Sequence, residues 1–140
     1  MSTKIPHVAS QGLSYRILNN DTIAITGVGD CEDTTLNIPD EIDGKIVSSI
    51  DSCAFQYNCD IVALTIPNTV ISIGAAAFYG CKKLRRIHVS DLVYNIGQHA
   101  FAACEKLETI ELGRIGQLEW FARDIFYCCD KITNIQITRG

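Results

Sequence analysis

The sequence lacks the features of several common protein classes. It has no run of about 18 apolar residues, which is what a membrane-spanning helix needs. Its opening, MSTKIPHVASQG, holds no apolar segment of the kind found in secretory signals. We therefore expect no membrane insertion, and a cytoplasmic location if the chain is complete.

Charge of one sign is also scarce, because the formal net charge is only -4 at pH 7. Domains that bind nucleic acid carry a clustered basic surface. The one short basic cluster, Lys82, Lys83, Arg85 and Arg86, is more simply explained as a solvated edge. We therefore expect no nucleic-acid partner.

Metal-ligand motifs are missing as well. There are seven cysteines and three histidines, but no CxxC spacing. Zinc sites use closely spaced ligand pairs, so the sequence predicts no metal and no cofactor. Because seven is an odd number, at least one thiol is free or is paired between chains.

What the sequence does contain is an internal repeat, in a chain of 140 residues that is 47% apolar and therefore able to bury one core. An apolar dipeptide ends in Phe55, Phe78, Phe101 and Phe126, at steps of 23, 23 and 25 residues. Six apolar columns keep this register. Three of these columns follow each Phe by six, nine and eleven residues. They are Ile61, Leu84, Leu107 and Ile132; Leu64, Ile87, Ile110 and Ile135; and Ile66, Val89, Leu112 and Ile137.

The repeat predicts a solenoid of stacked units. Segments such as IHV and IEL alternate apolar and polar residues, which is the period of a strand with one buried face. A single unit cannot bury that face alone, whereas stacked units share a continuous core. The Ala-Phe segment on the opposite side suits a short helical or 3-10 turn, and Gly74 and Gly97 would ease a tight turn there.

The units resemble the BspA-type leucine-rich repeat, and residues 64–81, LTIPNTVISIGAAAFYGC, match its pattern nearly position for position. The resemblance covers residues 36–137 and departs at residues 112–126. It implies an α/β repeat solenoid, right-handed, with a parallel sheet on one face. It also implies a non-catalytic binding or adhesion module at the cell surface.

Both ends of the repeat raise the question of capping. Residues 13–29 read as two strands around the turn NND, and we expect this hairpin to cap the first turn. We therefore expect a single domain in two parts. Residues 1–32 form an N-terminal leader and the hairpin cap, and residues 33–140 form about four turns of the solenoid. At the other end, Ile132, Ile135 and Ile137 would lack a covering turn. This predicts self-association through that end, or a fragment of a longer surface protein.

A second column lies three residues after each Phe and reads Asn58, Cys81, Cys104 and Cys129. Both residue types are small and form hydrogen bonds, so the column predicts a structural ladder of buried, reduced thiols at a bend. The rival interpretation is a set of inter-turn disulfides or one reactive thiol. Stacked turns bring equivalent Cα atoms within disulfide range, but their parallel Cβ vectors suit that bond poorly.

The polar residues between the buried strand positions should point outward. They are the candidates for a binding strip that meets a protein partner of unknown identity: Thr65, Arg85, Arg86, His88, Glu108, Glu111, Asn134 and Gln136. The repeat places Arg85 beside Glu108 and His88 beside Glu111, so simple ladder pairing is the alternative interpretation.

Aromatic residues supply further interface candidates. Trp120 is the only tryptophan, a residue type enriched at interface hot spots, although a distorted turn could bury it instead. Tyr57, Tyr79 and Tyr127 follow the Phe column and could form an aromatic patch. The only indication of an enzyme is His99 near Cys104, which falls in the buried column, so we expect no catalysis.

Overall fold

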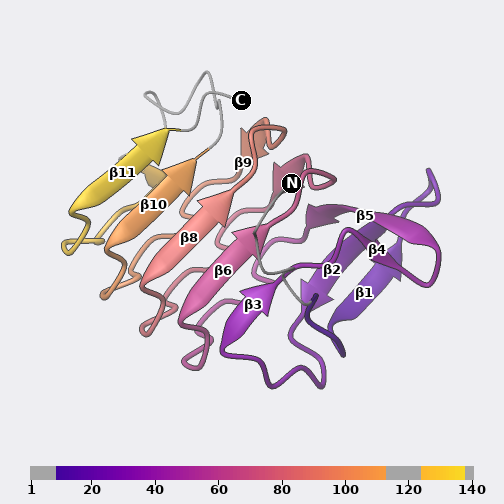
Figure 1. Cartoon of the computed structure of the whole chain (residues 1–140), viewed down its shortest axis with the longest axis horizontal. Coiled ribbons are helices and arrows are strands. Elements are labelled where there is room, and N and C mark those ends of the chain that lie inside the picture. The colour runs from indigo at the N-terminus through magenta and orange to yellow at the C-terminus, as the bar shows by residue number, and fades with distance from the viewer. Residues whose placement is uncertain (1–8, 113–123, 138–140) are drawn as a thin grey trace, which may run out of the picture.

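The computed structural model describes residues 9–112 and 124–137, which form a solenoid of stacked coils (Figure 1). Each coil runs through a strand of one sheet, a short strand of a second sheet and an arc that returns to the first sheet. The strands are β1 (Ser14–Ile17), β2 (Ile23–Gly27), β3 (Thr35–Asn37), β4 (Glu41–Ile42), β5 (Lys45–Ile50), β6 (Ala63–Ile66), β7 (Ser72–Ile73), β8 (Arg86–Val89), β9 (Asn95–Ile96), β10 (Thr109–Leu112) and β11 (Asn134–Ile137).

The first sheet has the order β11-β10-β8-β6-β3, and every pairing in it is parallel. Equivalent repeat positions pair directly, so that Leu64 lies opposite Ile87 and Ile87 lies opposite Ile110. These side chains point inward and are buried. The repeat solenoid and its parallel sheet are thereby confirmed.

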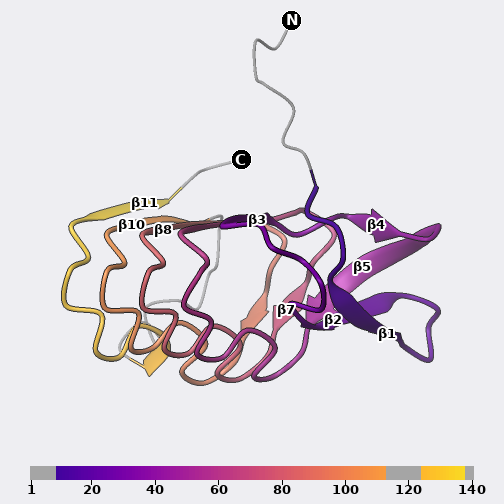
Figure 2. The ribbon, with the colours of Figure 1, turned by 90° about the horizontal axis from the view of Figure 1, so that it is seen from below.

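The second sheet holds the N-terminal hairpin (Figure 2). Its strand order is β1-β2-β5-β7-β9. β1 and β2 pair antiparallel as predicted, and β2 then pairs parallel with β5. Ile23 and Ile25 of β2 are completely buried, so the hairpin closes the first coil with apolar side chains. Beside it, Ser10 exchanges hydrogen bonds with Asn37 and covers part of the β3 edge.

The arcs are successive β-turns, which corrects the prediction of helical or 3-10 turns and of an α/β fold. Along residues 51–58, the amides of Ala54, Gln56 and Asn58 each bond to a carbonyl three residues back. The amides between them, starting with Cys53 and Phe55, bond to the carbonyls of the next coil. A helix would direct every amide along its own axis, so it would forfeit these bonds between coils.

The arc conformation places mostly non-glycine residues in the left-handed region at fixed repeat positions. Two residues before the Phe stand Cys53, Ala76 and His99, and two residues after it stand Tyr57, Gly80, Ala103 and Cys128; all have φ between 55° and 71°. Positive φ at every fourth residue is incompatible with a helix. In the described residues, only residues 124–125 have helical backbone, and no described helix is long and apolar enough to cross a membrane.

Gly74 and Gly97 have a different role from the one predicted. Neither has a positive φ, so a tight turn does not require them. A β-carbon at Gly74 would lie 2.3 Å from the backbone nitrogen of Ser52 on the previous coil. These glycines are therefore needed because neighbouring coils approach closely at this point.

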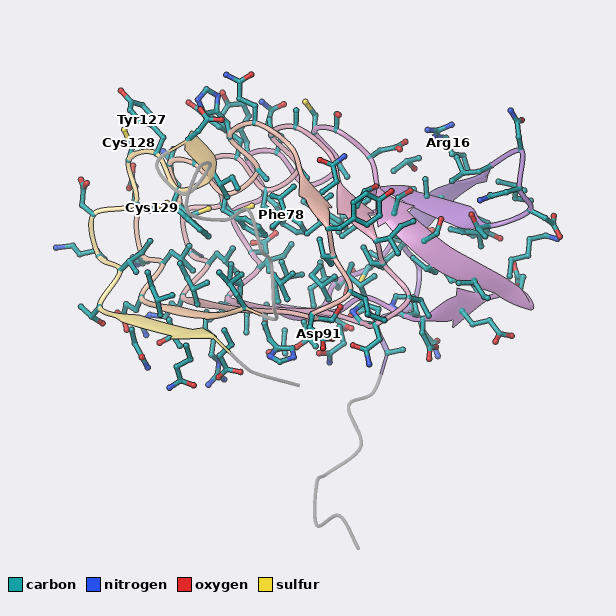
Figure 3. All side chains as sticks on the ribbon, turned by 90° about the horizontal axis from the view of Figure 1, so that it is seen from above. Arg16, Phe78, Asp91, Tyr127, Cys128 and Cys129 are labelled. Atoms are coloured by element: carbon teal, nitrogen blue, oxygen red, sulfur yellow. The ribbon has the colours of Figure 1, made fainter. Side chains whose placement is uncertain are left out.

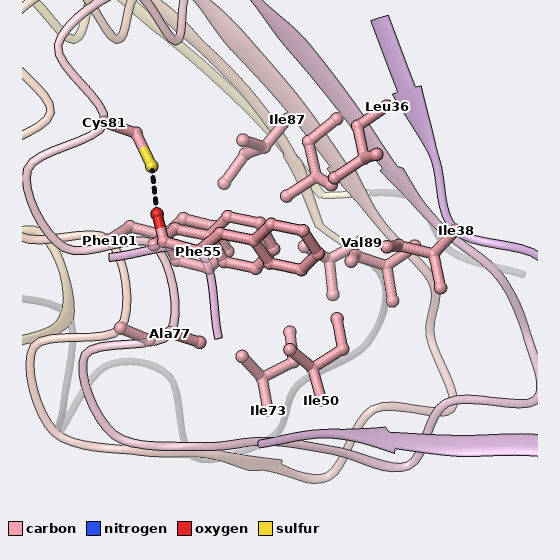
Figure 4. Close-up of a cluster of buried hydrophobic side chains, with 14 of the residues drawn as sticks. Leu36, Ile38, Ile50, Phe55, Ile73, Ala77, Cys81, Ile87, Val89 and Phe101 are labelled. Carbon is pink, nitrogen blue, oxygen red and sulfur yellow. Dashed lines mark hydrogen bonds between the residues drawn. The ribbon is translucent and has the colours of Figure 1, made fainter. Parts of the chain in front are cut away.

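Stacked phenylalanines run through the centre of the core (Figure 4). The ring centroids of Phe55 and Phe78 are 5.0 Å apart, those of Phe78 and Phe101 are 5.2 Å apart, and the rings of both pairs are nearly parallel. Phe126 continues the stack at 5.9 Å. The offset stacking of aromatic rings adds to the free energy gained from burial, so this column stabilises the stack of coils.

Candidate functional site

The outward side of the first sheet is the surface that the sequence singled out. We call it the outer sheet face and define it by two columns of paired residues. One column holds Asn37, Thr65, His88, Glu111 and Gln136, and the other holds Thr35, Ala63, Arg86, Thr109 and Asn134. Strand alternation directs these side chains away from the core residues beside them in each strand, although Ala63 and the side-chain oxygen of Asn37 are buried. The face crosses all five strands.

His88 and Glu111 form a close side-chain contact on this face. Nδ1 of His88 lies 3.0 Å from Oε2 of Glu111, and both side chains are roughly half exposed. The β8–β10 register puts the two residues directly opposite each other. The pair therefore holds both groups in place while leaving each accessible to a ligand.

The second predicted pair is looser. Arg85 and Glu108 precede β8 and β10, and their charged atoms lie 3.8 Å apart on exposed side chains. Solvent-exposed ion pairs of this kind contribute little to stability, typically below about 1 kcal/mol. Arg86 is also exposed. The charged groups of Arg85, Arg86 and Glu108 are therefore exposed at this part of the surface and contribute little to the stability of the fold.

The remaining predicted residues are dispersed. Asn134 and Gln136 are exposed on β11, whereas Thr65 is half-buried on β6. Ile132 packs against the core. Ile135 is 56% exposed, although its paired neighbour Ile110 is completely buried. Ile137 pairs with Leu112, and Trp120 lies outside the described residues.

Sequence reasoning missed the β3 contribution to the face. Asn37 pairs with Thr65 and extends the column by one strand. The signal was present, because Leu36 and Ile38 are buried on either side of it. The partial first unit obscured the alternation.

The cysteine column lies inside the bend, away from the outer sheet face. All seven cysteines are free thiols, and Cys81 and Cys104 are completely buried. The three thiols of the column each donate a hydrogen bond to the carbonyl of the Phe one coil earlier: Cys81 to Phe55 at 3.3 Å, Cys104 to Phe78 at 3.3 Å and Cys129 to Phe101 at 3.0 Å.

Asn58 stands in the same column, but its side chain accepts hydrogen bonds instead of donating one to a Phe carbonyl. Its side-chain oxygen accepts hydrogen bonds from the amides of Asp60 and Ile61 at 2.9 and 3.1 Å. Phe55 is the first Phe of the stack, so a residue in the Asn58 position has no Phe carbonyl of an earlier coil to bind. Asparagine and cysteine therefore share a place in the repeat without sharing a role.

The buried thiols are poor nucleophiles. For Cys104, the interaction with the thiol of Cys129 lowers the pKa, but the interaction with the thiol of Cys81 and burial outweigh it and raise the pKa to about 12. The interaction with the thiol of Cys104 and burial likewise raise the pKa of Cys129. Reactivity requires the thiolate, so these groups stay inert near neutral pH.

No arrangement suited to catalysis or to metal binding is evident in the part of the chain that the structure describes. His99 binds Asp124 at 2.9 Å and Cys104 binds a backbone carbonyl, so they do not form a catalytic pair with each other. Within residues 9–112 and 124–137, no three histidine, cysteine or acidic side chains cluster as metal ligands. The site offers fixed polar groups on a broad surface.

Comparison with protein families gives a match to the BspA type leucine rich repeat region, in six copies over residues 48–140. None of the curated proteins matches the sequence. The match includes most of the repeat columns described above.

Solved structures show the same fold. A leucine-rich repeat protein from Bacteroides capillosus is 23% identical with a TM-score of 0.72, and the alignment covers 94% of this chain and 98% of that one. A leucine rich cell surface protein from Faecalibacterium prausnitzii is 20% identical with a TM-score of 0.65 over 98% of this chain, which spans only 44% of that protein. The leucine rich repeat protein of T. pallidum is 20% identical with a TM-score of 0.52, over 94% of this chain and 82% of that one.

Proposed function

Because the chain belongs to the BspA-type leucine-rich repeat family, we propose that it is a non-catalytic module that binds another protein through the outer sheet face. Repeat proteins present broad surfaces of this kind for binding, and their stability comes from neighbouring units. The observation that carries the proposal is the half-exposed pair of His88 and Glu111 at the centre of a polar column that crosses five strands.

The composition of the face fits protein recognition. Arg86, His88 and Glu111 supply a donor, a titratable ring and an acceptor on adjacent strands. Such groups fix the register and the specificity of an interface more than its raw affinity. The similarity to a leucine rich cell surface protein supports a location at the cell surface for this chain too, with adhesion as its use.

Substitution of the face tests the proposal. The variant with Arg86→Ala, His88→Ala and Glu111→Ala should keep its circular dichroism spectrum and its unfolding transition, but should lose capture of a specific protein from cell-surface extract. A matched variant with Lys82→Ala, Lys83→Ala and Glu105→Ala removes three exposed charged side chains that lie outside the outer sheet face and should bind normally. Equal binding by wild type and the sheet variant would refute the proposed site.

The exposed Ile135 favours a second function, which is self-association through β11. This strand is the edge of the described sheet, and Ile135 is exposed where Ile87 and Ile110 of the same column are buried. An edge strand with an apolar side chain is a template for pairing. Light scattering should then show a dimer that Ile135→Lys converts to a monomer, and a monomeric wild-type protein would reject this function.

A further inference from the structure

A row of aromatic rings crosses the arcs, on a different side of the solenoid from the outer sheet face. We call Tyr57, Tyr79, His99 and Tyr127 the aromatic row. Their ring centroids are spaced by 5.6 Å from Tyr57 to Tyr79, 6.4 Å from Tyr79 to His99 and 6.0 Å from His99 to Tyr127. Figure 3 shows Tyr127 projecting outward from the arc, whereas Phe78 lies inside.

The two end rings of the row are exposed, Tyr79 and His99 between them are half-buried, and the rings are held in place. Tyr57 and Tyr127, at the two ends, are 62% and 60% exposed. A β-carbon at Gly80 would lie 2.6 Å from the ring of Tyr57, so this glycine leaves the space in which the ring rests. His99 is fixed by its 2.9 Å contact with Asp124 on the next coil. The row is therefore pre-organised, which reduces the entropy lost on binding.

The charge of the four arc segments that carry the row restricts what the row can bind. Residues 51–58, 74–81, 97–104 and 124–129 contain no lysine and no arginine. Their only acidic residues are Asp51 and Asp124, and each already has a side-chain partner, Arg16 and His99 respectively. Binding of an anionic polymer depends on cationic side chains. A cationic ligand would find no unpaired carboxylate in these segments.

The arc segments that carry the row also expose small or neutral hydrogen-bonding side chains. Ser52, Gln56, Ala75 and Gln98 are exposed, and Gln56 and Gln98 directly precede Tyr57 and His99 in the sequence. Tyrosine itself combines an apolar ring with a polar hydroxyl. A sugar ring has the complementary chemistry, with C–H groups that pack on an aromatic ring and hydroxyls at its rim that bind amides and hydroxyls.

We propose that the aromatic row is a binding site for a neutral, linear oligosaccharide that lies along the stack of coils. The sugar rings pack against Tyr57, Tyr79 and Tyr127, while Gln56, Gln98 and the His99–Asp124 pair bind the hydroxyls. The site is separate from the outer sheet face, so one module holds a protein partner and a glycan at the same time.

Tyrosine NMR tests this directly. The chain has five tyrosines, so ring-labelled protein offers three reporters in the row and two outside it, Tyr15 and Tyr94. The probes are cellohexaose, maltohexaose and mannohexaose, and each is added at millimolar concentration. At least one should shift the signals of Tyr57, Tyr79 and Tyr127 and leave Tyr15 and Tyr94 in place. The affinity should be insensitive to salt, because no charges pair.

Variants complete the test. Tyr57→Ala and Tyr127→Ala should each weaken the binding of that sugar roughly three- to tenfold, the effect expected for loss of one aromatic contact. Tyr94→Ala removes an equally exposed tyrosine from elsewhere and should change nothing. Absence of any shift with all three sugars overturns the proposal, and so does equal weakening by Tyr94→Ala. Shifts of the row with hexalysine or decaproline, but with no sugar, also overturn it and assign the row to a peptide.

Discussion

Gly97 lies so close to Ala75 of the preceding coil that a β-carbon on Gly97 would be 2.3 Å from the backbone nitrogen of Ala75. Gly74 has the same relation to Ser52. The contact joins backbone to backbone, so no side chain can move aside to relieve an added methyl group. The spacing of the coils therefore depends on these two positions.

Replacement of Gly97 by alanine should destabilise the fold. We expect Gly97→Ala to lower the free energy of unfolding by about 1–3 kcal/mol, the usual cost of overpacking, as measured by urea denaturation.

The opposite exchange provides the control. Ala103 has φ of 56°, so Ala103→Gly should raise the free energy of unfolding by up to about 1 kcal/mol, because glycine adopts this conformation without strain. If Gly97→Ala left the urea midpoint unchanged, the close approach of the coils would be wrong.

The thiol of Cys104 contributes to stability through its bond to Phe78. Cys104→Ala removes a completely buried donor and leaves a small cavity, so we expect a loss of about 1–3 kcal/mol in the free energy of unfolding. Cys128→Ala, at an exposed position, should stay within about 0.5 kcal/mol of wild type. If the two variants lost the same free energy of unfolding, the hydrogen bond from Cys104 to Phe78 would not be a source of stability.

Thiol alkylation should divide the seven cysteines into classes. Cys53, Cys59 and Cys128 are exposed and should react rapidly in the native protein, whereas Cys31, Cys81 and Cys104 are buried and should react only after unfolding. Cys129 is half-buried and should react at an intermediate rate. Mass spectrometry after a short iodoacetamide pulse gives the count at each site. Seven labels in denaturant without reductant are required if all thiols are free, and fewer would indicate a disulfide.

The raised pKa of Cys104 predicts how stability changes with pH. An unfolded thiol ionises near pH 8.5, but the folded thiol stays protonated up to about pH 12. Above pH 8.5 the unfolded state therefore binds fewer protons than the native state, so the free energy of unfolding falls as pH rises. Urea midpoints from pH 7 to pH 10 should decrease for wild type and decrease less for Cys104→Ala. A steeper decrease in the variant would contradict this assignment.

The core and the sheet register could be predicted because they repeat. Phe55, Phe78 and Phe101 recur at a constant step, and a column of identical residues implies a column in space. The contacts of Arg85 with Glu108 and of His88 with Glu111 follow from the same step.

The arcs could not be predicted in the same way. Their conformation depends on amides such as that of Phe55, which bond to carbonyls of the next coil, and local sequence does not contain that partner. Positive φ at Ala76 and Ala103 gave no glycine signal. The His99–Asp124 pair was hidden because the last step of the repeat is 25 residues rather than 23.

Hydrogen bonds between coils run along the stack both on the sheet and on the arcs, from each coil to the next. A pulling force applied along the stack therefore acts in line with these bonds and loads them one layer after another. The solenoid should extend under tension by releasing single coils in sequence, each at a modest force. A force applied across the stack would load many layers together, so the molecule should resist it more strongly.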